Sequence, residues 1–339
     1  MALFSFMIKY FFGIICDMKP YKTKNELINH LEVDRHLRLE EEYKIFLDEY
    51  RYGHVIDAYK DILASSVLTG KIHVYNEKIT LKTFTDLFSI DEYFSIKLTL
   101  YISNYEKMLK KFISDKVCES MVAAGSIDCC DYSFFEKAKD DAFNSYLNCF
   151  IPLNKEYDVH ANEVLRRENT YNNRIRVINK ILGFISGENS SELNYYASDY
   201  FNEKGVIPFY ILIGSLSISN LIIIFEMLNK SIQFEFLSKA IRKNHIEDKD
   251  ITSLMSKHNV IRIIRNIIHH HEPLIPFLCK REYIDFDTKI SSIKILSNVY
   301  AKSCIKDKIV IKSDLDFSFI NGLTSKKAQK LIRIVDLLK

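Results

Sequence analysis

The 339-residue chain contains no tryptophan, and glycine and proline are scarce, at nine and five residues. So few chain-breaking residues argue against β-rich folds with many turns, collagen-like repeats and glycine-rich phosphate-binding loops. Long helices with few interruptions fit this composition, because glycine and proline most often end them. The composition therefore favours long helices, in two domains or in one large one.

The chain also lacks an excess of either charge. It carries 47 Lys and Arg against 44 Asp and Glu, a formal net charge of +3. This balance gives no bulk attraction to nucleic acid or to a membrane, so any such binding must come from local patches. Hydrophobic residues make up 47%, which is enough to bury a sizeable core.

The cysteines lack any pairing or metal-binding pattern. There are seven of them, an odd number without a C-x-x-C spacing, and Cys129 and Cys130 are adjacent. This arrangement suits neither a disulfide framework nor a zinc site. We therefore expect reduced thiols, a cytoplasmic location and no cofactor.

Neither of the two longest apolar stretches is typical of a membrane span. Residues 1–18 are too short, and Lys9 lies inside their apolar run with no cleavage site after it. Residues 208–228 are long enough, but Gly214, Asn220 and Glu226 interrupt them. The first stretch predicts an extra N-terminal helix, the second predicts a buried pair of core helices, and no membrane contact is expected.

Hydrophobic periodicity predicts helices along most of the chain. The clearest pattern covers residues 91–113, where apolar side chains recur every three or four residues. Residues 22–64 are also helical in pattern, whereas residues 114–160 are less regular. Residues 71–81 alternate around Asn76 and predict a short hairpin or an extended loop.

The last helix is amphipathic and follows Thr324 or Ser325, either of which can cap it.

The segment from Arg262 to Pro273 carries the polar side chains that point to chemistry. Two arginines, one asparagine and three histidines stand in an otherwise aliphatic helix. Helix geometry puts Arg262, Asn266 and His270 along one line, with Arg265 and His269 beside it. The helix is thus predicted to bury its aliphatic side and to present a cationic, titratable strip.

Such a strip suits cleavage of RNA without a metal ion. The substrate's 2′-hydroxyl is the nucleophile, and it needs a base with a pKa near neutrality, which histidine provides. Arginine can stabilise charge on the non-bridging oxygens, and asparagine can orient the phosphate or the imidazole. The alternative is an ordinary solvated helix end, where the helix dipole favours histidine.

No metal site is predicted in this segment. Three consecutive histidines on a helix point in different directions, so they cannot all bind one ion. The H-E-x-x-H pattern is also absent, because His271 and Glu272 are followed by Pro273.

Five short motifs occur in a characteristic order. They are Lys19-Pro20 before a helix, Tyr50-Arg51, Phe84-Thr85-Asp86-Leu87 before Tyr105-Glu106, Pro208-Phe209-Tyr210, and Arg265-Asn266-x-x-x-His270. In this order they resemble the Abi-like proteins, the abortive-infection group of AbiD and AbiF type, which is a branch of the HEPN superfamily. The last motif resembles the family's R-N-x-x-A-H, with His269 in place of its alanine. His269 and His271 therefore stay alternatives to His270 as the catalytic histidine.

The resemblance implies an all-α fold with a HEPN-like helical bundle core over residues 19–280 and an insertion at about 114–160. Residues 1–18 and 281–339 are then N- and C-terminal helical extensions, and the hairpin is a minor feature. The family also implies a homodimer in which two Arg–His strips face each other across a cleft.

The same resemblance implies a toxin-like antiphage endoribonuclease that is independent of metal. Arg265, Asn266 and His270 are its expected catalytic residues, and Arg262, His269 and Glu106 support them. Glu106 is expected to pair with Arg262 or Arg265, or else with Lys110 in an ordinary helical ion pair.

The resemblance also implies an alternative function, a non-catalytic RNA-binding protein that forms a ribonucleoprotein with a small structured non-coding RNA. Its candidate contacts lie in a basic stretch that contains several asparagines, with Tyr171 placed to stack on a base. These residues are Arg166, Arg167, Tyr171, Arg174, Arg176 and Lys180. The tail residues Lys326, Lys327, Lys330 and Arg333 form a second candidate patch. For both patches a solvated helix face is the alternative.

Overall fold

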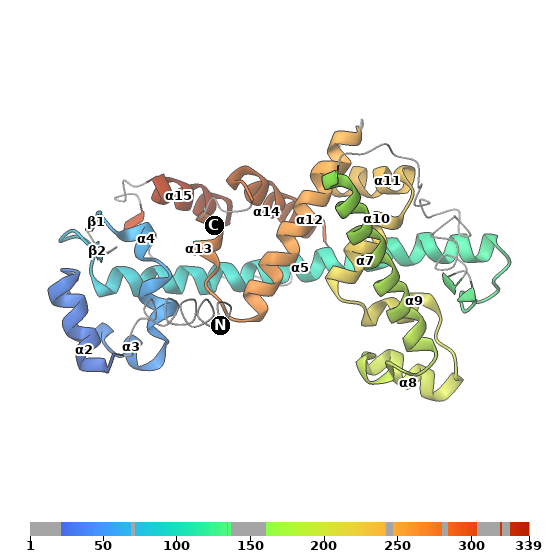
Figure 1. The fold of residues 1–339 in the computed structure, drawn as a ribbon, viewed down its shortest axis with the longest axis horizontal. Coiled ribbons are helices and arrows are strands. Elements are labelled where there is room, and N and C mark those ends of the chain that lie inside the picture. The colour runs from blue at the N-terminus through green and yellow to red at the C-terminus, as the bar shows by residue number, and fades with distance from the viewer. Residues whose placement is uncertain are drawn as a thin grey trace, which may run out of the picture. The chain divides into compact units, whose positions relative to one another are not determined.

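The computed structural model describes residues 22–68, 72–133, 135–136, 161–241, 247–279, 284–303, 319–320 and 326–338. These residues are mostly helical, and Figure 1 shows their arrangement. The predicted all-α class is therefore confirmed. The predictions for residues 1–18, most of the insertion, and the caps Thr324 and Ser325 fall outside the described residues.

The chain divides into two compact units. Unit 1 comprises Met1–Glu92, Ile275–Cys279 and Asp314–Asp336, and unit 2 comprises Tyr93–Leu274, Lys280–Ser313 and Leu337–Lys339. The boundary after Glu92 falls inside the range 19–280 that the family resemblance treats as one domain.

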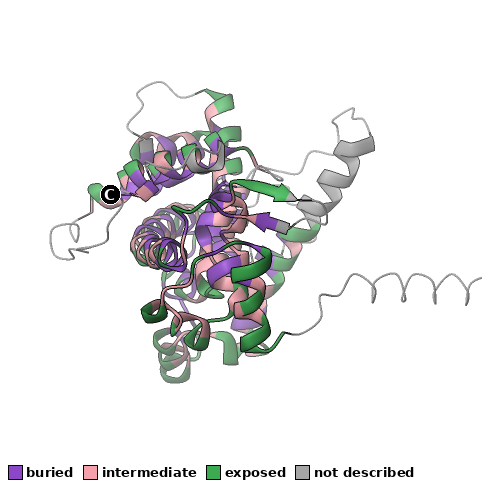
Figure 2. Ribbon diagram, turned by 90° about the vertical axis from the view of Figure 1, so that its left-hand side faces the viewer, coloured by how far each residue is buried: buried purple, intermediate pink, exposed green. Residues whose placement is uncertain are grey.

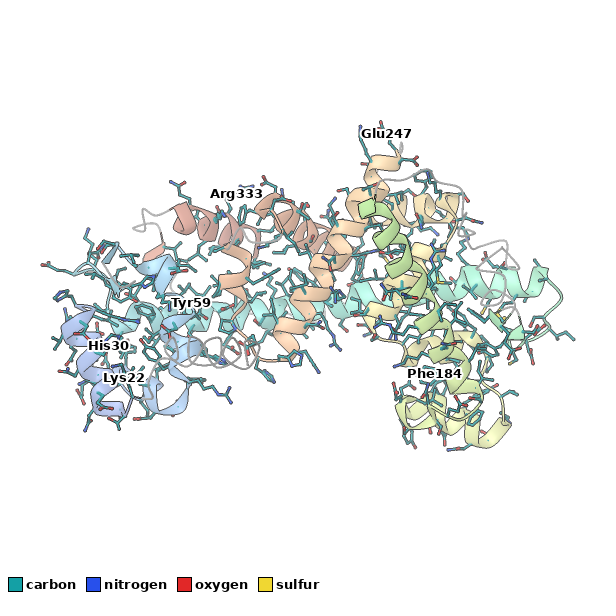
Figure 3. All side chains as sticks on the ribbon, in the orientation of Figure 1. Lys22, His30, Tyr59, Phe184, Glu247 and Arg333 are labelled. Atoms are coloured by element: carbon teal, nitrogen blue, oxygen red, sulfur yellow. The ribbon has the colours of Figure 1, made fainter. Side chains whose placement is uncertain are left out.

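Unit 1 is built from short helical segments. They are α2 (Lys24–Asn29), η1 (His30–Asp34), η2 (Glu41–Tyr43), α3 (Phe46–Glu49), η3 (Gly53–Asp57), α4 (Lys60–Leu63), α13 (Leu274–Cys279) and α15 (Lys326–Leu338). Asp91 is 2% exposed and lies in the core of this unit. Its carboxylate accepts hydrogen bonds from the Tyr59 hydroxyl at 2.7 Å and from the Ile275 amide at 3.0 Å. Tyr59 is labelled in Figure 3.

A hairpin is present, but one strand earlier than the alternation predicts. Strand β1 (Ser66–Leu68) pairs antiparallel with β2 (Ile72–Val74), so the residues around Asn76 do not join the two strands. Leu81 instead begins helix α5, and Ile79 lies in the turn before it, where its amide donates to the Asn76 carbonyl at 2.9 Å. Ser66 and Val67 of β1 are exposed, whereas His73 of β2 is buried, and Figure 2 colours these classes green and purple.

Helix α5 (Leu81–Ala123) is the longest described element and is continuous in Figure 1. The predicted helix over residues 91–113 is therefore confirmed, and the helix extends beyond it at both ends. Val117 and Met121 are fully buried and continue the apolar stripe, so the irregular segment begins only after Ala123. Gly125, with a φ of 102°, provides the break.

Unit 2 packs several helices around the second part of α5. They are α7 (Ala161–Ile185), η4 (Ser190–Glu192), α8 (Tyr195–Lys204), α9 (Phe209–Leu212), η5 (Ile213–Ser215), α10 (Ile218–Met227), α11 (Lys230–Ile241), α12 (Asp248–His269) and α14 (Phe286–Ala301). Helix α12 packs against α10, α11 and α14, and α10 packs against α7. The apolar stretch 208–228 forms α9, η5 and α10 and is largely buried, as predicted.

No described helix combines the length and the apolar character that crossing a membrane requires. The cysteines that the structure describes, Cys118, Cys129, Cys130 and Cys279, are free thiols.

Candidate functional site

Helix α12 carries the polar strip, and its own sequence sets where it begins. The Asp250 carboxylate accepts a hydrogen bond of 2.9 Å from the amide of Glu247, the residue labelled at the start of the helix in Figure 3. Asp248 and Asp250 both lie in the first turn, where negative charge stabilises the positive end of the helix dipole. The first turn is therefore well defined by local interactions.

One face of α12 is buried in unit 2. The buried positions recur every three or four residues and include Ile251, Leu254, His258, Ile261 and Ile264. Arg262, Arg265 and Asn266 follow on the neighbouring face and are half-buried. The buried aliphatic side predicted for this helix is confirmed up to Ile264, whereas Ile267 and Ile268 are half-buried, like the polar strip.

The end of α12 departs from the predicted helix through His271. The last helical residue is His269, and His271 has a φ of 55°, in the left-handed region. The His271 amide donates to the Ile268 carbonyl at 3.1 Å, and the Glu272 amide donates to the Ile267 carbonyl at 3.0 Å. These two bonds form a Schellman motif, which ends the helix before Pro273 and leaves all three histidines exposed.

A pocket of about 290 Å³ opens where α12 faces α5, within unit 2. We call it the Arg265 pocket. Helix α12 contributes Arg265, Ile268 and His269, and α5 contributes Thr99, Ile102, Ser103, Glu106, Lys107 and Lys110. The pocket thus brings together side chains separated by about 160 positions in the sequence.

The charges in the Arg265 pocket do not cancel. The Lys110 ammonium lies 2.9 Å from Oε1 of Glu106, so these two charges offset each other. Arg265 and Lys107 have no ion-pair partner among the residues that the structure describes. A half-buried guanidinium without a partner is costly unless water or an anion satisfies it, so the pocket favours an anionic ligand.

Only some of the predicted site residues meet here. Arg265, His269 and Glu106 line the Arg265 pocket, and Glu106 pairs with Lys110, which was the alternative to a pair with Arg262 or Arg265. Asn266 and His270 lie outside the pocket lining, although the His270 ring packs 5.6 Å from that of His269.

Arg262 also lies outside the lining. Its Nη2 donates a hydrogen bond of 2.8 Å to Oδ1 of Asn259, one helical turn earlier.

Nothing in the described part of the chain gathers three or more His, Cys, Asp or Glu side chains in a metal-binding arrangement.

The basic stretch of α7 offers fewer exposed cations than its sequence suggests. Arg174 is only 7% exposed, and its Nη2 donates to the Glu226 carbonyl at 3.3 Å. Burial lowers the pKa of Arg174 to about 10. Lys180 pairs with Glu192 at 2.5 Å, whereas Arg176 is exposed.

The side chains of Arg166, Arg167 and Tyr171 fall outside what the structure describes, as do those of Lys326 and Lys327. In the second candidate patch, Lys330 donates a hydrogen bond of 3.1 Å to the Cys279 carbonyl, and Arg333 is exposed.

Sequence reasoning missed the lysines of α5 and one buried histidine. Lys107 and Lys110 stand on the polar face of α5, where their spacing marks a helix side but gives no indication of its neighbour. His258 precedes Arg262 by one turn, yet it is fully buried against Tyr105. The sequence signal that could have identified His258 is its spacing, because it lies four residues before Arg262 and eight before Asn266.

A family model described as Abi-like protein matches residues 45–276. No curated protein and no solved structure matches the chain.

Proposed function

The chain belongs to the Abi-like protein family, whose description points to abortive infection, and on this premise we propose that it restricts phage by cleaving RNA without a metal ion. The reaction takes place at the Arg265 pocket. The observation that supports this most directly is the half-buried Arg265, which lacks an ion-pair partner among the described residues and shares a concave site with Lys107 and His269.

In the proposed reaction, the Arg265 guanidinium binds the non-bridging oxygens of the scissile phosphate. Its fork of N–H donors matches the geometry of a phosphate, and it stabilises the charge that grows there in the transition state. Lys107 adds a second positive charge at the same pocket. Asn266, one residue further along α12, orients the phosphate or an imidazole.

Histidine supplies the proton transfers. One imidazole removes the proton of the 2′-hydroxyl as its oxygen bonds to phosphorus, and a second imidazole protonates the departing 5′-oxygen as the P–O5′ bond breaks. The products are a 2′,3′-cyclic phosphate and a 5′-hydroxyl. His270 is the histidine at the family position, and His269 is the histidine of the pocket itself.

A homodimer with facing strips would bring the histidines of two chains to one phosphate. His269 and His270 are both exposed at the end of α12, so both are accessible to such a shared site. This arrangement supplies both an acid and a base from one short motif.

The test is incubation of the purified protein with total RNA and a chelator. We expect wild type to generate 2′,3′-cyclic phosphate ends, and Arg265→Ala, His269→Ala and His270→Ala to lower the rate at least tenfold, since each removes a charge or a proton carrier. His271→Asn is the matched control, because asparagine tolerates the left-handed backbone there. Cleavage that is unchanged in Arg265→Ala would exclude this pocket as the active site.

The ribonucleoprotein alternative draws less support from the geometry. Of its described basic residues in α7, Arg174 is buried and Lys180 is paired, and only Arg176 is exposed. It predicts RNA that co-purifies with intact ends, whereas the nuclease predicts cut ends.

A further inference from the structure

A second pocket opens beside the Arg265 pocket, also within unit 2. It has a volume of about 300 Å³ and we call it the Tyr210 pocket. Helix α5 contributes Lys110, Lys111, Ser114 and Asp115, and α9 with η5 contributes Tyr210, Ile213 and Gly214. Because Lys110 lines both pockets, the two are neighbours along one side of α5.

Lys110 is held at the boundary between the two pockets. Its ammonium lies 2.9 Å from Oε1 of Glu106 and donates to the Gly214 carbonyl at 3.0 Å. A lysine ammonium has three N–H donors, and the described residues account for two of them. The third is available to a ligand that passes from one pocket to the other.

The two pockets differ in charge. In the Tyr210 pocket Lys111 lies 2.8 Å from Asp115, and Lys110 is already offset by Glu106. The Arg265 pocket keeps Arg265 and Lys107 unpaired among the described residues. A phosphate is therefore favoured in the Arg265 pocket, and an uncharged, flat group is favoured in the Tyr210 pocket.

Tyr210 gives the second pocket an aromatic wall. Its side chain is 54% exposed, although its neighbour Phe209 is fully buried. The core is thus filled by Phe209, and the Tyr210 ring is left at the surface. An exposed aromatic face beside a phosphate site binds nucleobases by stacking, because every base presents a π-face.

We propose that the Tyr210 pocket is a nucleobase subsite, which holds a base that flanks the scissile phosphate of a single-stranded RNA. A base inside a duplex is covered by its neighbours, so only an unpaired, unstacked base can stack on Tyr210. Lys110 donates to the backbone that joins this nucleotide to the phosphate in the Arg265 pocket. The inference rests on the proposed function, since it takes RNA as the substrate.

The test separates binding from cleavage. A fluorescent ten-nucleotide single-stranded RNA carrying 2′-fluoro groups cannot be cut, because it has no 2′-hydroxyl nucleophile. Its dissociation constant is measured by fluorescence anisotropy for wild type, Tyr210→Ala, Tyr210→Phe and Tyr195→Ala. Tyr195 is the matched control, since it is 87% exposed and lines neither pocket.

We expect Tyr210→Ala to weaken binding about tenfold, which is the loss of one stacked base. Tyr210→Phe keeps the ring and should stay within about twofold of wild type, as should Tyr195→Ala. A 5-iodouridine in the oligonucleotide should crosslink to Tyr210, as located by mass spectrometry of the peptides. A duplex of the same sequence should bind equally well to wild type and to Tyr210→Ala.

Equal binding of the single strand by wild type and Tyr210→Ala, or no binding by wild type, would overturn the subsite. If instead the proposed nuclease activity is absent, the experiment gives a different result. In that case the 2′-fluoro RNA still binds through Tyr210, while unmodified RNA is left uncut.

Discussion

The hydroxyl of Tyr105 on α5 lies 2.5 Å from Nε2 of His258 on α12, and both side chains are fully buried. Phe225 packs edge-on against the His258 ring at 5.2 Å. Burial lowers the pKa of His258 to about 3, so the imidazole is neutral in the folded protein at pH 7. This bond joins the two helices that line the Arg265 pocket.

The low pKa of His258 predicts that unit 2 loses stability in acid. An unfolded histidine titrates near pH 6.5, so between pH 6.5 and about 3 the unfolded state binds the additional proton. The His258 contribution is therefore fully present above pH 6.5, and it falls by up to about 1.4 kcal/mol per pH unit as the pH drops through that window.

Urea denaturation at pH 7, 6, 5 and 4 measures this dependence. His258→Gln keeps a hydrogen-bonding partner for Tyr105 but does not titrate, so its unfolding midpoint should vary less with pH than that of wild type. Parallel pH profiles for the two proteins would contradict the prediction.

Asp91 is expected to be essential to the core of unit 1. Asp91→Ala leaves the Tyr59 hydroxyl and the Ile275 amide without this acceptor in the interior, which should cost about 2–4 kcal/mol of unfolding free energy. Asp86→Ala is the control on the same helix. It removes only an exposed ion pair with Lys82, and should cost less than about 0.5 kcal/mol. Similar losses in the two variants, measured by chemical denaturation, would refute this role.

The end of α12 offers a stabilising change. His271 occupies a left-handed backbone conformation with a φ of 55°, which glycine adopts without a steric cost. We expect His271→Gly to raise the free energy of unfolding by up to about 1 kcal/mol. His271→Val should lower it, because a β-branched residue is strained in that region. A melting temperature that falls in His271→Gly would show that the side chain, not the backbone, dominates there.

Substitutions at Arg174 and Arg176 should differ in their effect on the stability of the fold. Arg174→Gln removes a buried guanidinium that donates to the Glu226 carbonyl, so it should destabilise the fold by about 1–3 kcal/mol. Arg176→Gln should leave stability unchanged, because the side chain is exposed. If α7 contacts RNA, Arg176→Gln should also make the plot of log binding constant against log salt concentration less steep, by about the slope that one phosphate contact contributes. Equal melting temperatures for the two variants would contradict the burial of Arg174.

Local patterns were sufficient for the helical class, for the helix over residues 91–113 and for the polar strip of α12. Each of these depends on periodicity within a single segment, which the order of residues encodes directly. The motif around Arg265 and Asn266 likewise led to the family. The hairpin was assigned one strand too late, because alternation alone does not distinguish a second strand from the first turn of a helix.

Tertiary structure alone decided how these segments meet. The lysines of α5 come to face Arg265, Arg174 is buried, and His269 lines the pocket while His270 does not. None of this follows from spacing within one helix. Side-chain environment depends on which helix packs against which face, and that choice is a property of the whole buried core.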